Sequence, residues 1–160
     1  MSSPTSPSTL RAFLDILKDE LGWQFNLNEF DDRLRLQKFV YLASAFGFEH
    51  PYSYGMHLRG PYSPPLAQDY YSDLSSIEPA DDALRTFDVA NFTELVESRD
   101  VRWLEVAATL RAYVIRLQRT GTGGNVIERA IEETMEEKDE PRRYVEQVYD
   151  DLRRAHAISD

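Results

Sequence analysis

The chain has 160 residues, of which 42% are hydrophobic and 29% are charged, and its formal charge at pH 7 is −10. This size and composition are typical of one folded domain with its own core, and they exclude a globally disordered chain. The sequence has no cysteine, which excludes a disulfide framework, a thiolate nucleophile and a cysteine-ligated zinc site.

The acidic balance also limits the partners of the protein. A surface of this charge repels phosphate backbones and anionic lipid, so we expect nucleic-acid binding to be local or absent and we expect no membrane docking. Lysine occurs only at Lys18, Lys38 and Lys138, whereas arginine is abundant. This acidic, lysine-poor composition indicates a salt-adapted source such as a halophilic archaeon, or a high-GC genome, rather than a particular ligand.

The first seven residues are polar and contain two prolines. We expect residues 1–7 to form a disordered leader and residues 8–160 to form a single domain. The leader lacks the basic region and apolar core of a signal peptide. No apolar run approaches the roughly 20 residues of a membrane span. We therefore expect a cytoplasmic protein.

Apolar residues at helical spacing predict two helices in the first third of the chain. The first is expected to begin at an N-cap on Ser8 and to end near Leu21. The second is expected to start from a cap on Asn28 or Asp31 and to reach about Phe46.

A different pattern follows, because apolar and polar residues alternate from Tyr52 to Leu58 and predict a short strand. We expect Gly60-Pro61 to end this strand, and Ser63 to cap a helix with prolines in its first turn. Thr86–Val89 is a candidate for a second brief strand that would complete a hairpin-like pair.

The C-terminal half is predicted to be helical. After a loop over residues 75–88, we expect helices over residues 90–98, 100–119, 125–137 and 141–156. The predicted fold is a mainly α, single helical domain of about six to seven helices with a small antiparallel β element.

Three patterns that could hold a ligand have simpler structural interpretations. Gly121–Gly124 lacks the Lys-Ser/Thr pair of a phosphate-binding loop and is better explained as a turn between helices. The three histidines are not spaced as metal ligands. The acidic run from Glu132 to Glu137 is typical of a solvated helix face. We therefore predict no catalytic residue, no metal site and no cofactor.

Six tyrosines crowd into about 30 residues, at positions 41, 52, 54, 62, 70 and 71. Tyrosine has a large rigid ring with a polar tip, so this group fits either a small core or a binding surface. The sequence leaves both interpretations open.

Two blocks of this region resemble the Panacea-type antitoxin domain, the family that includes SocA-like proteolytic adaptors, or a related uncharacterised prokaryotic family. The first block, residues 36–42, reads Leu-Gln-Lys-Phe-Val-Tyr-Leu. The second, residues 56–64, reads Met-His-Leu-Arg-Gly-Pro-Tyr-Ser-Pro. The resemblance covers about residues 30–75. It departs from the family pattern where His57-Leu58 replaces the usual aromatic residue and where Arg59 precedes the glycine.

The resemblance implies a non-catalytic protein-interaction module that binds and neutralises a partner protein, for example a toxin encoded nearby. The residues expected to contact the partner are Gln37, Lys38, Tyr41, Arg59, Gly60, Pro61, Tyr62 and Tyr70. A purely structural role competes with this interpretation, because Gln37 is placed to hydrogen-bond the backbone at the broken strand.

A winged-helix-type transcriptional regulator is the alternative function. It requires a basic recognition helix, and the best candidate segment, residues 111–119, offers only Arg111, Arg116 and Arg119. A hydrolase ranks last, because the sequence shows no nucleophile paired with a base.

Overall fold

The computed structural model describes residues 5–57, 60–121 and 124–158. Its helices are α1 (Ser6–Leu21), α2 (Phe30–Ala43), α3 (Pro64–Tyr70), α4 (Val89–Val96), α5 (Val101–Thr120), α6 (Val126–Lys138) and α7 (Arg142–Arg154). Two short strands, β1 (Gly55–His57) and β2 (Gly60–Tyr62), form an antiparallel pair, and three 3-10 turns, η1 (Ser44–Phe46), η2 (Leu74–Ser76) and η3 (Asp82–Leu84), complete the described elements. The predicted mainly helical class with a small antiparallel element is confirmed.

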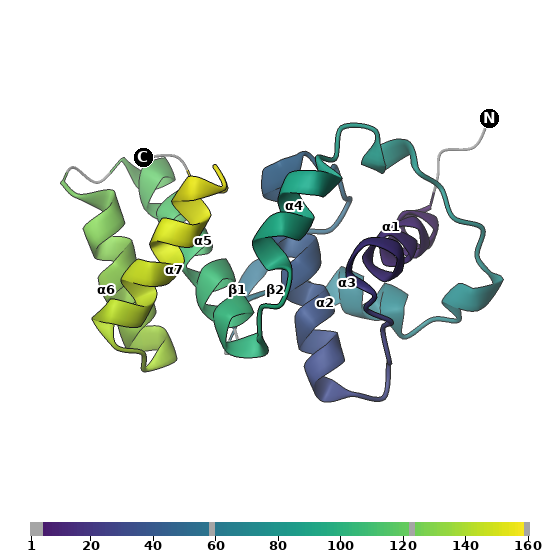
Figure 1. Cartoon of the computed structure of the whole chain (residues 1–160), viewed down its shortest axis with the longest axis horizontal. Helices are drawn as coiled ribbons and strands as arrows, with labels where there is room; N and C mark the ends of the chain where they lie inside the picture. The colour runs from purple at the N-terminus through teal and green to yellow at the C-terminus, as the bar shows by residue number, and fades with distance from the viewer. Residues whose placement is uncertain (1–4, 58–59, 122–123, 159–160) are drawn as a thin grey trace.

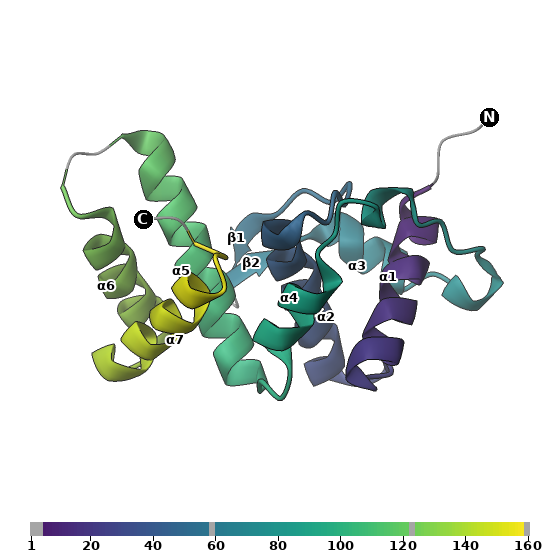
Figure 2. The same ribbon diagram turned by 45° about the horizontal axis from the view of Figure 1, so that its top comes forward.

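Helix α5 is the central element of the fold. It packs against α2 and β2 on one side and against α6 and α7 on the other. Figures 1 and 2 show α1 to α4 and α6 with α7 on opposite sides of this long helix. The buried core is continuous through both halves, from Phe13 and Leu36 through Leu104 to Val148. None of the described helices combines the length and the apolar character that crossing a bilayer requires.

The first two helices lie close to the predicted positions, but their caps differ. Helix α1 begins at Ser6 because Thr5, rather than Ser8, is its N-cap, and the Thr5 hydroxyl accepts from the Ser8 N–H. Two residues of the predicted leader are thus helical, and residues 1–4 lie outside the described part. Helix α2 starts after Glu29, so neither Asn28 nor Asp31 is its cap.

The predicted strand pairing was wrong. The alternating segment contributes only Gly55–His57 as a strand, and Leu58 lies outside the described residues. Its partner is Gly60–Tyr62, so Gly60-Pro61 lies within the second strand instead of ending the sheet. Proline is tolerated there because β2 is an edge strand that needs no N–H at that position. Thr86–Val89 forms no strand, because Phe87 enters the core and Asp88 caps α4.

The remaining elements agree with the sequence-based prediction. Ser63 caps α3, and its hydroxyl accepts from the Leu66 N–H at 3.3 Å. The prolines that follow occupy the first turn, where the missing N–H costs nothing. The last four helices match the predicted ranges to within a few residues.

Candidate functional site

The side chain of Gln37 holds the junction between β2 and α3. Gln37 lies on α2 and is only 1% exposed. Its Oε1 accepts from the Ser63 N–H at 2.9 Å, and its Nε2 donates to the Ser63 carbonyl at 2.9 Å. A neighbouring strand would pair with this backbone in a similar way. Gln37 therefore fixes the point at which the hairpin ends and the next helix begins.

Lys38 holds the same hairpin at Pro61, two residues before Ser63 in the chain. It is 1% exposed, and its Nζ donates to the carbonyl of Pro61 at 2.7 Å. A buried ammonium group is costly unless it is hydrogen-bonded, and this bond offsets part of that cost. Both polar residues of the Leu-Gln-Lys block are thus directed inward, toward the Gly-Pro segment.

Gly60 allows the hairpin to approach α5. Its φ is +95°, a left-handed conformation that residues with a Cβ rarely adopt. A Cβ at this position would lie 2.4 Å from Oγ1 of Thr109 on α5 and 3.6 Å from Nζ of Lys38. The glycine is therefore required both by its backbone geometry and by the close packing of three elements.

Several tyrosine side chains lie on and around the part of α2 that carries Gln37. The hydroxyl of Tyr54 donates to the backbone carbonyl of Gln37 at 3.0 Å. The Tyr70 hydroxyl lies near the side chains of Gln37 and Tyr62, and burial raises the pKa of Tyr70 to about 12. Tyr41 packs against Tyr54 with ring centroids 5.2 Å apart. These phenols stay neutral near pH 7, so they act as packing and hydrogen-bonding groups.

A second polar network joins the segment before β1 to α1 and α3. The hydroxyl of Tyr52 lies 2.6 Å from Oδ2 of Asp69 and 3.1 Å from the Ser6 carbonyl. The Tyr52 N–H donates to Nδ1 of His50 at 3.1 Å. Burial lowers the pKa of His50 to about 4. His50 is therefore neutral at physiological pH, with its Nδ1 used as an acceptor.

The structure brings most of the predicted partner-binding residues together, but mainly in the interior. Gln37, Lys38, Gly60, Pro61 and Tyr70 are buried. Two further residues of the set, at positions 41 and 62, are partly exposed, and Arg59 lies outside the described residues. A partner at this place would touch the two partly exposed rings, and the role of the whole set in binding stays a prediction.

The tyrosine group is divided in the same way between core and surface. Tyr52 and Tyr70 are buried, whereas Tyr71 is 59% exposed. Its ring centroid lies 5.2 Å from that of Tyr70. The core interpretation thus fits the buried pair, and the surface interpretation fits Tyr71.

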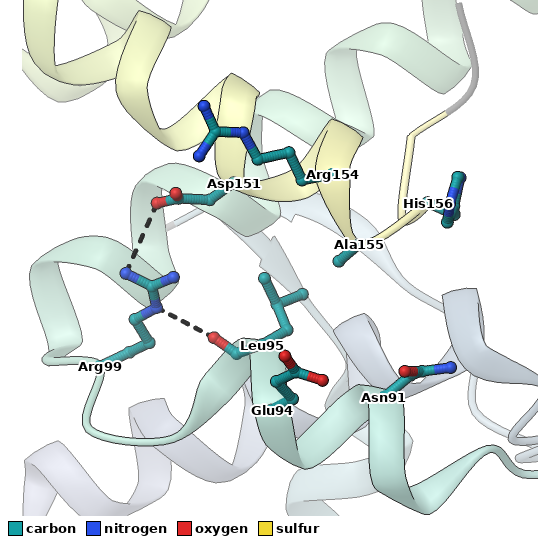
Figure 3. A pocket seen from close by; sticks show the side chains of 8 residues that line it. All are labelled: Asn91, Glu94, Leu95, Arg99, Asp151, Arg154, Ala155 and His156. Atoms are coloured by element: carbon teal, nitrogen blue, oxygen red, sulfur yellow. Dashed lines mark hydrogen bonds and ion pairs between the residues drawn. The ribbon is translucent and has the colours of Figure 1, made fainter.

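A cavity of about 280 Å³ lies between α4 and the end of α7. Its lining side chains are drawn in Figure 3. Arg99 is held by the Leu95 carbonyl at 2.9 Å and by Asp151 at 3.5 Å, and Asp151 also accepts from Nε1 of Trp103 at 3.0 Å. Arg154 and His156 extend in different directions, so they do not converge on a common point (Figure 3). In this cavity, Asp151 of α7 is thus bonded to Trp103 at the start of α5 and to Arg99 just before it.

The sequence-based prediction missed a surface around Trp23. Trp23 lines two hollows, one of about 360 Å³ beside α1 and α3 and one of about 630 Å³ beside the turn between α4 and α5. The only signal in the sequence is the density of aromatic residues in the connector over residues 23–27. Nothing in that connector indicates which later segments complete the two hollows.

Comparisons with known proteins add no family to this description, since no family model, no curated protein and no solved structure matches the chain. Within the described residues, no group of three or more histidine, aspartate or glutamate side chains is placed to hold a metal ion.

Proposed function

We propose that this protein is a non-catalytic interaction module of the Panacea type, which binds and neutralises a partner protein. One observation carries the proposal. The two sequence blocks that resemble that family are hydrogen-bonded to each other, through Gln37 to Ser63 across 26 residues and through Lys38 to Pro61 across 23 residues. A chance resemblance in two separate segments would give no reason for their polar side chains to meet.

The use of these polar groups supports a scaffold role for the motif. The side chains of Gln37 and Lys38 form hydrogen bonds with backbone groups of Ser63 and Pro61. Side chains that act on a substrate need access to it, and both of these are buried. The motif therefore favours a protein that presents a surface over one that performs chemistry. Such a module would act in the cytoplasm, beside the partner that it neutralises.

The winged-helix alternative fits the structure less well. A recognition helix must enter a DNA groove, which requires one free face along its length. The candidate segment lies on α5, which is flanked by α2, α6 and α7. Arg111 is turned toward the protein, because its Nε donates to the Ala157 carbonyl at 3.0 Å and its guanidinium lies 5.4 Å from the Tyr41 ring centroid. Of the three arginines of this segment, only Arg116 and Arg119 are exposed.

The proposal is tested by coexpression with the neighbouring gene. We expect that gene to arrest growth when it is expressed alone, growth to return when this protein is present, and the two proteins to coelute in the salt of the native cytoplasm. Gly60→Val serves as the control, since a Cβ at Gly60 clashes with Thr109 and should abolish rescue by loss of folding. Lack of both rescue and complex would contradict the proposal.

A further inference from the structure

The connector between α1 and α2 places an aromatic ridge on the surface. The ring of Trp23 lies 6.0 Å from that of Phe25 and 5.2 Å from that of Phe39. Phe25 in turn lies 5.6 Å from Tyr70, which packs on the exposed Tyr71. Trp23 and Phe25 are both partly exposed. We call this ridge and the hollows on both sides of Trp23 the Trp23 surface.

The two hollows have apolar walls and basic groups at their edges. The hollow beside α3 is lined by Leu14, Phe25, Leu27, Tyr70 and Leu74. The basic groups beside it are Arg11 and Lys18. The hollow beside the α4–α5 turn is lined by Leu21, Phe39 and Val96, with Arg35 and Arg99 among its charged residues.

The residues that line the Trp23 surface carry a small positive excess, unlike the chain as a whole. Four basic side chains and three carboxylates line the two hollows, in a protein whose formal charge is −10. Two of the basic groups are ion-paired, Arg11 with Asp15 at 3.5 Å and Arg99 with Asp151 at 3.5 Å. Arg11, Arg35 and Arg99 each donate to a backbone carbonyl, which fixes their positions. Lys18 is exposed, whereas Lys38 and Lys138 are buried. The one lysine available to a partner thus lies beside this surface.

We propose that the Trp23 surface is the docking site for an amphipathic segment of the partner protein, with apolar anchors and acidic flanks. Tryptophan, tyrosine and arginine dominate the binding energy of protein interfaces, and apolar hollows accept anchoring side chains. Apolar residues of the segment fill the hollows on both sides of Trp23. Its carboxylates pair with Lys18 and with the outer edge of Arg11, where charge complementarity selects acidic over basic segments.

This inference rests on the proposed function and connects it to the buried motif. Tyr70 forms part of the wall of one hollow, and its hydroxyl lies near the side chain of Gln37. The Leu-Gln-Lys and Gly-Pro blocks thus support the docking surface from inside the fold. Contact with the partner occurs on the opposite side of Tyr70.

A displayed library of random 16-residue peptides, screened against the full chain, tests the docking site. We expect enriched peptides to carry apolar residues flanked by aspartate or glutamate, and a synthetic copy to bind the wild-type protein. Lys18→Glu should weaken this binding at least tenfold, because it reverses the charge that the peptide meets. Trp23→Ala should weaken it by a similar factor. Arg143→Glu, an equal charge change on the exposed face of α7, is the matched control and should leave the affinity unchanged.

Folding is checked by circular dichroism, and Lys18→Glu is the decisive variant because Lys18 is an exposed residue whose replacement leaves no cavity. Failure to enrich acidic amphipathic peptides, or equal binding by wild type and Lys18→Glu, would overturn the inference. A homodimer that Trp23→Ala dissociates in sedimentation experiments would also overturn it, by assigning the surface to a second copy. Rescue from the neighbouring gene's toxicity in any of these cases would leave the proposed function intact.

Discussion

The side-chain amide of Gln37 makes two hydrogen bonds of 2.9 Å with the backbone N–H and carbonyl of Ser63. A helix thereby supplies to a two-stranded hairpin the pairing that a third strand would give. Isolated two-stranded hairpins are marginal in water. This one is stabilised by α2 from one side and by contact with α5 from the other.

Replacing Gln37 by leucine should destabilise the fold strongly. The N–H of Ser63 would be left buried without a partner, at about 1–3 kcal/mol, whereas its carbonyl would keep the bond from the Ala67 N–H at 3.1 Å. We expect the free energy of unfolding to fall by roughly 1–3 kcal/mol, measured by urea denaturation. The exposed Gln147→Leu is the matched control and should change it by less than about 0.5 kcal/mol. Equal effects at both positions would show that the Ser63 pairing contributes little.

Lys38→Arg should be destabilising although it keeps the charge. The Nζ of Lys38 reaches the Pro61 carbonyl as a compact donor in a fully packed site, and a planar guanidinium does not fit there. We expect a loss of about 1–3 kcal/mol in the free energy of unfolding. Lys18→Arg, on the exposed end of α1, should be neutral. A stable Lys38→Arg protein would refute the packed geometry at this site.

Gly60→Ala should cost more than the same change at Gly22. Both glycines have positive φ, but a Cβ at Gly60 meets Thr109 Oγ1 at 2.4 Å, whereas one at Gly22 meets nothing within 4 Å. The left-handed conformation alone costs roughly 1–2 kcal/mol, which is our expectation for Gly22→Ala. The clash should add about 1–3 kcal/mol at Gly60.

Thermal unfolding of the single variants and of Gly60→Ala with Thr109→Ala measures the clash directly. The double variant should be more stable than the sum of the single changes predicts, because removing Oγ1 relieves the contact. Additive losses would mean that the two residues do not touch.

Acidification should destabilise the protein through His50. The pKa of His50 is lowered by burial to about 4, below its ordinary value of 6.5, so the unfolded chain binds this proton more readily than the folded one. The stabilisation is complete above pH 6.5 and is lost as the pH falls toward 4. Urea midpoints measured between pH 7 and pH 4 should fall more steeply for wild type than for His50→Gln. Parallel curves would assign the acid sensitivity to carboxylates alone.

The helices could be predicted from the sequence because each one has its own apolar stripe and most of them also have a side-chain N-cap. The leucine spacing in α1 and the cap at Ser63 are local signals, and both lead to the observed elements. The second strand could not be predicted in this way. Gly60–Tyr62 is too short to show an alternating pattern, and Thr86–Val89 shows a better pattern although its side chains serve the core and a helix cap.

The candidate site was predictable only in part, because its contacts join distant segments. The position of Gln37 beside the Gly-Pro segment follows from the order of the two blocks. The approach of Thr109 to Gly60 depends on the placement of α5, and no local pattern near either residue encodes it. The hollows beside Trp23 likewise need α3 and the α4–α5 turn to complete their walls.

Because Lys38 is buried, its chemical modification can be used to measure local opening of the native protein. Lys18 is exposed and should react with an amine-specific reagent within the mixing time, whereas Lys38 can react only when the hairpin lifts from α2. The ratio of the two modification rates, followed by mass spectrometry, therefore measures how often this part of the native molecule opens. Because the chain has only three lysines, the modification of each one can be followed separately.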